Sequence, residues 1–181
     1  MGGAWARVSG WVWGPLSYLG AAIALLACLA DQASKNYLLA IYHLGDRGVV
    51  PVTSFLNLVL AWNTGISYSL LPQQGPMGQA ILLIAKAIAI LCLWVWMAQA
   101  RTRITALSLG LIIGGAVGNA IDGLRFGAVV DFVHFHITTA TWHFSWYIFN
   151  LADTVIVAGV IGLLYESFFA DYAAKEPGSG A

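Results

Sequence analysis

Long apolar stretches alternate with shorter polar segments along this chain of 181 residues. Four stretches reach about 20 mostly apolar residues, the length that a helix needs to cross roughly 30 Å of hydrocarbon. Helices satisfy every backbone polar group internally, and the regular alternation of a membrane barrel is missing from the sequence. We therefore predict an all-α membrane protein, a bundle of four transmembrane helices at about residues 16–41, 77–99, 104–122 and 146–169.

The basic residues indicate how this bundle is oriented. Those next to the predicted helices fall on one side of the membrane, and they are Arg7, Arg101, Arg103 and Lys175. Basic residues are enriched on the cytoplasmic side, so we expect both termini to be cytoplasmic. The longer connections, about 43–76 and 123–145, then face outward. Residues of about 175–181 form a short polar tail that we expect to be disordered.

The first outward segment has the pattern of strands. Residues 49–62 are rich in β-branched and aromatic side chains, and Asn63, Thr64 and Gly65 follow as a turn signal. We expect short strands at the membrane surface. The predicted fold is thus a four-helix bundle with a small extracytoplasmic β-rich segment.

Glycines recur on the third predicted helix. Gly110, Gly114 and Gly118 follow one another at four-residue spacing, which leaves one helix face almost without side chains. Such a face favours close approach of a neighbouring helix in a membrane.

The composition agrees with a membrane protein and excludes two other classes. Hydrophobic residues make up 60% of the chain and charged residues only 9%, whereas soluble domains are about a quarter charged. The net charge is +0, so no basic surface is available to bind nucleic acid. Cys28 and Cys92 lie inside apolar runs, which argues against a disulfide framework.

Ionisable residues gather in the outward half of the bundle. Each charged group in a spanning segment costs about 2.5 to 3.5 kcal/mol on insertion scales, so such residues are functional candidates. They are Asp31 and Lys35 on the first helix, Asp122 on the third, Asp131 in the second outer segment and Asp153 on the fourth helix. Asp31 and Lys35 are four residues apart and share a helix face, which favours a structural ion pair.

Two asparagines accompany these carboxylates. Asn119 precedes Asp122 by three residues, and Asn150 precedes Asp153 by the same interval. Each amide can therefore lie beside the carboxylate on the same helix face.

Two carboxylates are what a water-activating peptidase needs. One accepts a proton from water, while its partner keeps a proton and polarises the scissile carbonyl. We predict that Asp131 and Asp153 form this pair and titrate together. Their spacing in the sequence does not establish that they meet.

Five motifs follow one another along nearly the whole chain. They are DQASK at 31–35, NTGISY at 63–68, GGAVGNAID at 114–122, VVDF at 129–132 and FNLAD at 149–153. In order, spacing and placement they resemble the motifs of the lipoprotein signal peptidases, also called signal peptidase II.

The resemblance implies an aspartic endopeptidase of the bacterial inner membrane. It would remove the signal peptide from diacylglyceryl-modified prolipoproteins by cutting just before the lipidated cysteine, with Asp131 and Asp153 as catalytic residues. Supporting or substrate-binding roles are implied for Asp31, Lys35, Asn63, Gly65, Asn119, Asp122 and Asn150, and Arg125 is a further candidate. No metal or organic cofactor is implied, and we expect a monomer in contact with membrane phospholipid.

The chain departs from the family pattern at three positions. Gly123 stands where the family usually has arginine, so either Arg125 replaces that arginine or the activity is reduced. Tyr68 stands where phenylalanine is usual. His134 occupies a position where an acidic residue is common, and the sequence assigns it no role.

Other functions stay open at this point. Intramembrane Asp and Asn also mark ion paths, so a small ion- or proton-coupled transporter is the alternative, although no inverted repeat is present. His134, His136 and His143 suggest a metal cluster, but histidines beside aromatics are more often interfacial or core residues. Lys86 belongs to no motif and either extends towards the interface or turns to the carboxylates.

Overall fold

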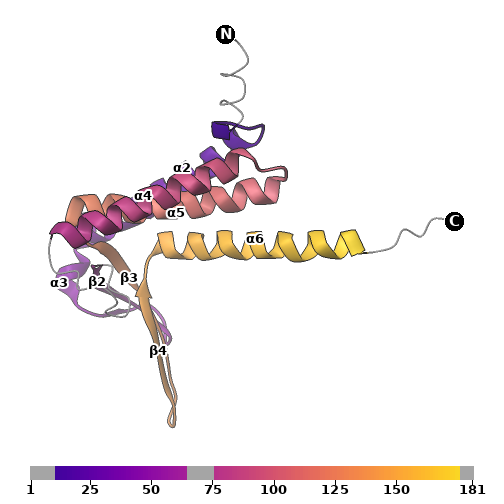
Figure 1. Cartoon of the computed structure of the whole chain (residues 1–181). Helices are drawn as coiled ribbons and strands as arrows, with labels where there is room; N and C mark the ends of the chain where they lie inside the picture. Colours follow the sequence, from indigo (N-terminus) through magenta and orange to yellow (C-terminus); the bar gives the residue numbers. More distant parts are fainter. Residues whose placement is uncertain (1–10, 65–75, 176–181) are drawn as a thin grey trace.

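Four long helices and a small sheet make up the structure, a computed structural model that describes residues 11–64 and 76–175 (Figure 1). The helices are α2 (Ser17–Asn36), α4 (Pro76–Ala98), α5 (Arg103–Phe126) and α6 (Leu151–Lys175). A π-helical turn, η1 (Tyr37–Ile41), extends α2, and a short helix, α3 (Leu44–Arg47), follows it. The described chain is thus mostly helical, as predicted.

The four long helices are apolar enough to cross a membrane. Each has a window of 18 residues with few charges and high hydropathy. α5 is the central helix, because it packs against α2, α4 and α6, and half of its apolar window is buried. The other three helices turn most of their apolar surface outward, which suits lipid as the surrounding solvent. The prediction of four spanning helices agrees with this arrangement.

Two predicted helix boundaries were wrong. The helix predicted over 146–169 begins only at Leu151, since the preceding residues pair as a strand with β3. Apolar residues continue through this junction, so hydropathy alone did not separate strand from helix. The helix predicted over 104–122 continues to Phe126 and ends where Gly127 adopts φ 70°. Glycine is the residue that takes this left-handed conformation at a helix end at no steric cost.

Glycines allow the central helix to approach its neighbours closely. A Cβ added to Gly114 would lie 2.4 Å from the carbonyl oxygen of Ala24 on α2, a distance that a real side chain does not tolerate. Gly110 faces α2 in the same way, and Gly115 faces Ala152 on α6. The glycine spacing therefore sets the helix contacts, as the sequence predicted.

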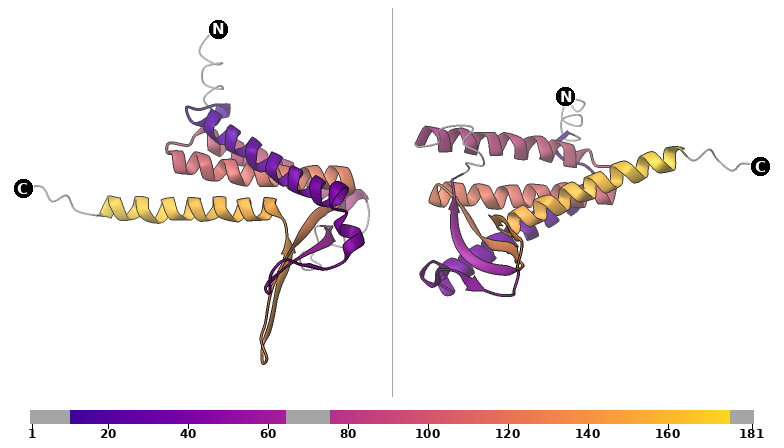
Figure 2. Two further views of the ribbon diagram at one scale, coloured as in Figure 1. Left: turned by 180° about the vertical axis from the view of Figure 1, so that it is seen from behind. Right: turned by 90° about the horizontal axis from the view of Figure 1, so that it is seen from below.

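The sheet has four antiparallel strands in the order β1-β2-β3-β4. They are β1 (Val50–Pro51), β2 (Leu56–Asn63), β3 (Val129–Thr138) and β4 (His143–Phe149). The hairpin of β3 and β4 projects from the helices at the end where α6 begins, as Figures 1 and 2 both show. Ala61 on β2 pairs with Asp131 on β3, so the sheet brings Asp131 to the point where strands and helices meet.

Candidate active site

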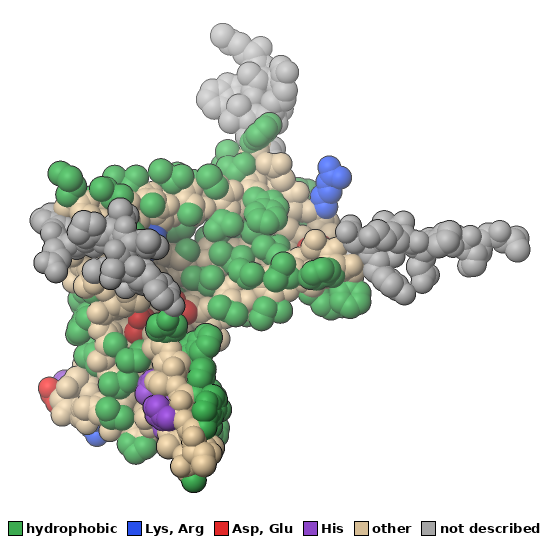
Figure 3. Space-filling model, turned by 60° about the horizontal axis from the view of Figure 1, so that its bottom comes forward, with side chains coloured by type: hydrophobic (Ala, Val, Ile, Leu, Met, Phe, Trp, Pro, Cys, Tyr) green, Lys and Arg blue, Asp and Glu red, His purple; other side chains and the backbone are tan. Residues whose placement is uncertain are grey.

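The predicted carboxylates converge where the sheet joins the helix bundle. Acidic side chains appear in the hollow between these two parts in Figure 3, whereas hydrophobic side chains cover the helices. α2, α5, β3 and the first turn of α6 each contribute to this site. Asp31 and Ala152, which are hydrogen-bonded in it, are 121 positions apart in the sequence, so the tertiary fold brings the site together.

Lys35 is the centre of a buried ionic cluster. Its Nζ lies 2.8 Å from Oδ2 of Asp31 and 2.7 Å from Oδ2 of Asp122. It also donates to Oδ1 of Asn119 at 3.0 Å. Lys35 is 2% exposed and both carboxylates are fully buried. The ion pair predicted between Asp31 and Lys35 is present, and Asp122 makes it a triad that joins α2 to α5.

Backbone amides also donate to both carboxylates of this cluster. Oδ1 of Asp31 accepts from the amide of Ala152 at 3.0 Å, and Oδ2 of Asp122 accepts from the amide of Val130 at 3.2 Å. Both amides stand at the beginning of an element that carries a predicted catalytic aspartate. Buried charges need such partners to offset their desolvation. The cluster therefore holds the starts of β3 and α6 against the helices.

Gln32 belongs to this cluster, although the sequence analysis did not single it out. Its Nε2 lies 2.8 Å from Oδ1 of Asp122, 3.1 Å from the carbonyl oxygen of Gly118 and 3.3 Å from Oδ2 of Asp31. The feature of the sequence that could have indicated its role was its position beside Asp31 in the first motif. An uncharged amide draws little attention until its partners are known.

A capping interaction positions Asp153 at the start of α6. Oδ2 of Asp153 accepts from the backbone amide of Asn150 at 3.1 Å, and the backbone amide of Asp153 donates to Oδ1 of Asn150 at 3.0 Å. This reciprocal pattern is a capping box, which fixes both side chains at a helix N-terminus. Oδ1 of Asp153 also accepts from Nδ2 of Asn119 at 2.9 Å. The N-terminus of α6 favours the negative charge of this carboxylate.

Asp131 receives hydrogen bonds from two amides. Nδ2 of Asn150 donates to its Oδ1 at 2.6 Å, and Nδ2 of Asn63 donates to its Oδ2 at 3.0 Å. Burial raises the pKa of Asp131 to about 6, and the charge of Asp153 also acts to raise it, while the bonds from Asn63 and Asn150 act to lower it. Asn150 thus contacts both aspartates, one through its side-chain amide and the other through its backbone.

One of the predicted site residues, Arg125, is not part of this arrangement. Nη1 of Arg125 donates to Oδ1 of Asn36 at 3.2 Å on the surface, and its guanidinium lies over the ring of Phe126. Within 11–64 and 76–175, no hydrogen bond or ion pair joins Arg125 to the aspartates. Gly65 lies outside the described residues. Gly123 has open space where a Cβ would be, so no neighbouring atom prevents a side chain there.

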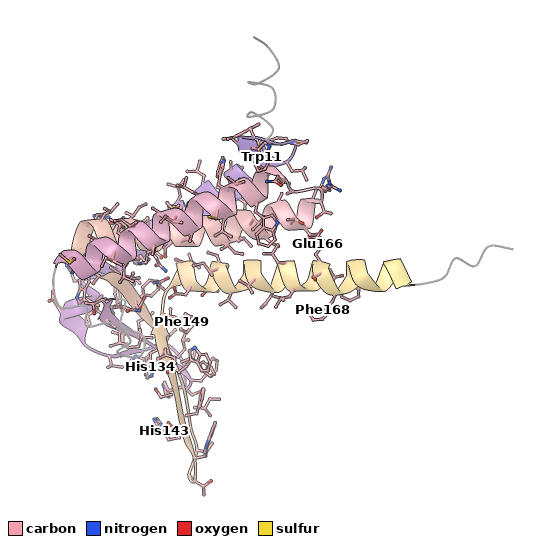
Figure 4. All side chains as sticks on the ribbon, viewed as in Figure 1. Trp11, His134, His143, Phe149, Glu166 and Phe168 are labelled. Carbon is pink, nitrogen blue, oxygen red and sulfur yellow. The ribbon has the colours of Figure 1, made fainter. Side chains whose placement is uncertain are left out.

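The three histidines lie on the hairpin and away from the aspartates. His134 and His143 follow the hairpin in Figure 4, whereas Phe149 lies at its junction with α6. Nε2 of His134 is 2.7 Å from the hydroxyl of Ser145, and Nδ1 of His143 is 2.9 Å from that of Thr138. Among the residues that the structure describes, no three His, Cys, Asp or Glu side chains are grouped to hold a metal ion.

Comparison with known proteins finds the same family. The model of the family "Signal peptidase (SPase) II" matches residues 23–169. A lipoprotein signal peptidase of Nitrobacter hamburgensis is 56% identical over 158 residues, 87% of this chain and 96% of the relative. One of Rhodopseudomonas palustris strain TIE-1 is 54% identical over 159 residues, which are 88% of this chain and 97% of the relative.

Solved structures share the fold. One, described as a bacterial membrane enzyme, superposes with a TM-score of 0.70 at 24% identity and covers 90% of this chain and 94% of its own. A second with the same description has a TM-score of 0.65 at 26% identity and covers 81% of this chain and 90% of its own. Together with the family match and the relatives above half identity, they place the chain: it belongs to the signal peptidase II family.

Proposed function

We propose that Asp131 and Asp153 are the catalytic carboxylates of this signal peptidase, and that its substrate is a lipoprotein precursor cut just before a diacylglyceryl-modified cysteine. The observation that carries the proposal is the double contact of Asn150. It donates to Oδ1 of Asp131 at 2.6 Å and to Oδ2 of Asp153 at 3.1 Å. A single residue therefore holds both carboxylates at one place, as a shared-proton pair requires.

The surroundings of the two aspartates support different tasks. Burial raises the pKa of Asp131 to about 6, so Asp131 keeps the shared proton more readily and hydrogen-bonds the scissile carbonyl. Asp153 stands in the first turn of α6, where it accepts hydrogen bonds from the backbone amide of Asn150 and from Nδ2 of Asn119. Asp153 therefore accepts the proton of the attacking water. Because the carboxylates interact, their ionisations belong to the pair.

The ionic cluster is the support of this pair. Asn119 donates to Asp153 at 2.9 Å and accepts from Lys35 at 3.0 Å, which connects the buried triad to one of the catalytic carboxylates. Geometry of this kind keeps a catalytic group within narrow limits before the substrate arrives. Lys35, Asp31 and Asp122 act in this proposal through position and charge, without touching the substrate.

The site belongs on the outer side of the bacterial inner membrane, with both termini in the cytoplasm. Support comes from α5: Arg101 and Arg103 lie at its start, whereas Asp122 stands at the opposite, acidic end, where Arg125 is the basic residue of the last turn. The sheet joins the helices at the acidic end. A lipidated precursor diffusing within the bilayer reaches a site between helices in the outer half, and a monomer surrounded by phospholipid is sufficient for this path.

Cleavage of two substrates by four proteins tests the proposal. A diacylglyceryl-modified precursor and its unmodified counterpart are given to the purified parent, to Asp131→Asn, to Asp153→Asn and to Asp46→Asn. Asp46 is an exposed aspartate on α3 and serves as the matched control. We expect the parent and the control to cut only the lipidated precursor, and each dyad variant to lose activity by at least about a thousandfold.

Other results would reject parts of the proposal. Cleavage by either dyad variant at the parent rate excludes that aspartate from catalysis. Equal cleavage of both precursors excludes recognition of the lipid. A well-folded parent that cuts neither substrate contradicts the reaction and turns attention to Gly123 or to the transport alternative.

A further inference from the structure

Lys86 is a charge that the proposed reaction does not yet use. It is the only charged residue of α4, whose sequence from Pro76 to Ala98 is otherwise apolar apart from Gln79. A lysine inside a spanning helix is costly and marks a functional position by default. None of the five motifs of the sequence includes it.

The position of Lys86 prevents it from reaching the membrane surface. It lies ten residues after Pro76 and twelve before Ala98, which is about 15 and 18 Å from the two helix ends at 1.5 Å per residue. Lysines that extend to the interface stand close to helix ends. Lys86 is half-buried, so its ammonium group needs a polar partner within the protein or its ligand.

A cavity beside Asp131 contains this lysine. It is partly open at the surface and encloses about 30 Å³, and its lining comprises Asn63, Thr64, Gln79, Leu82, Leu83, Lys86, Gly123, Gly127, Ala128 and Val129. Helical side chains lean towards the N-terminus of their helix, which directs Lys86 towards the residues of α4 that line the same cavity. Asn63 connects the cavity to the catalytic pair through its 3.0 Å bond to Asp131. Gly123 leaves this space open.

The ammonium group has neighbours of opposite charge but no bond to them. Asp122, Asp153 and Asp131 all act on Lys86 electrostatically. Yet no hydrogen bond or ion pair joins Lys86 to another residue within 11–64 and 76–175. The buried carboxylates already have partners, so the free donor in this cavity suits an acceptor that arrives with the substrate.

We propose that Lys86 is a substrate-binding residue, which holds a main-chain carbonyl oxygen of the precursor in this cavity, next to the bond that is cut. The cavity is small and open on one side, so it admits a carbonyl group of a peptide that lies across it, and its remaining walls include Leu82 and Leu83. A peptide in a membrane site must find donors for its carbonyl oxygens. Lys86 provides one on the side opposite α6. This inference rests on the proposed cleavage reaction.

Binding measured without cleavage is the primary test. In an Asp131→Asn and Asp153→Asn double variant, a fluorescent lipidated precursor is titrated against three further changes: Lys86→Met, Lys86→Arg and Ile84→Met. Ile84 lies exposed on the same helix and is the matched control. We expect Lys86→Met to weaken binding at least about tenfold, as loss of a charge-assisted bond does. Lys86→Arg should recover most of the affinity, and Ile84→Met should not alter it.

Kinetics on the active enzyme separate binding from a structural effect. Lys86→Met should raise KM by a similar factor, with kcat and its pH dependence nearly unchanged. Removal of a charge from an apolar span lowers the cost of insertion, so misfolding does not account for the loss. Unchanged affinity in Lys86→Met, or a fall in kcat at constant KM, overturns the inference. If the parent does not cut the precursor, the proposed reaction is refuted instead. The binding measurements still test Lys86 in that case, because they do not depend on cleavage.

Discussion

Replacement of Asp131 by asparagine should change how the stability of the protein depends on pH. Burial raises the pKa of this carboxyl from the ordinary 3.8 to about 6 in the folded protein. The side chain is 2% exposed, so solvent screens this effect little. Each pH unit of pKa difference corresponds to about 1.4 kcal/mol, so the whole difference corresponds to about 3 kcal/mol.

The sign follows from proton binding. The folded protein binds the proton of Asp131 more tightly than the unfolded chain does, so a low pH favours the folded state. This contribution is complete below the unfolded pKa of 3.8 and is lost as the pH rises through about 6. The Asp131→Asn variant has no carboxyl at this place and lacks the contribution. Its unfolding free energy should therefore vary less between about pH 4 and about pH 7.

The assay is denaturant unfolding in detergent, followed by tryptophan fluorescence, at several pH values across this interval. Parent and variant share every other titrating group, so the difference between their two pH profiles reports the ionisation of Asp131 together with its coupling to Asp153. We expect that difference to reach about 3 kcal/mol at most, with half of it developed at about pH 5, midway between 3.8 and about 6. Parallel profiles, or a variant with the stronger pH dependence, would refute the reasoning.

Three other changes test the framework of the site. Lys35→Met leaves two carboxylates buried without their cation and should lower the unfolding free energy by about 3 to 5 kcal/mol, as measured in the same assay at neutral pH. Gly114→Ala places a methyl group 2.4 Å from the carbonyl oxygen of Ala24 and should cost about 1 to 3 kcal/mol, whereas Gly123→Ala, with open space around it, should cost less than about 1 kcal/mol. Glu166→Ala removes the acceptor of two threonine hydroxyls at the start of α5 and should lower stability by about 1 to 3 kcal/mol without altering cleavage.

Glu166→Ala should lower stability without affecting cleavage, because Glu166 is distant from the proposed site. Glu166 lies towards the far end of α6 from Phe149 and the sheet (Figure 4). Loss of cleavage in Glu166→Ala at a temperature where the protein stays folded would contradict a site confined to the sheet end of the bundle. Equal destabilisation by Gly114→Ala and Gly123→Ala would contradict close packing of α5 on α2.

The spanning helices were predictable because lipid imposes a simple rule on them. A stretch that must hide its backbone from hydrocarbon has to be helical and long, so hydropathy and length locate it with little help from distant residues. Hydropathy and length were less reliable where an apolar stretch continues from the helix bundle into the sheet. Trp146 to Phe149 are apolar enough to continue a helix, yet they pair with β3. The signal that was overlooked is the capping pair of Asn150 and Asp153, which marks the true start of α6.

Some of the site was also accessible from the sequence, for a different reason. Charges are rare in apolar segments because they are costly there, so Asp31, Lys35 and Asp122 stood out as candidates. Gln32 did not, since an uncharged amide carries a smaller cost and its three partners lie on two helices. Arg125 was a candidate through sequence proximity to Asp122. In the structure its guanidinium contacts Asn36 at the surface instead.

The sequence by itself determined that this protein is surrounded by lipid, and it determined the number of long helices. It also determined the spacing of the glycines that let the helices approach, and the carboxylates and amides present at the end of the bundle next to the sheet. These follow from local composition and from the helical period, which each segment carries alone. The meeting of Asp131 with Asp153 was decided only by the tertiary structure. One carboxylate stands on a strand and the other at the start of a helix, and Asn150 contacts both because the β3–β4 hairpin returns the chain to the bundle. Contacts of that kind depend on strand register and helix packing together, which no single segment encodes.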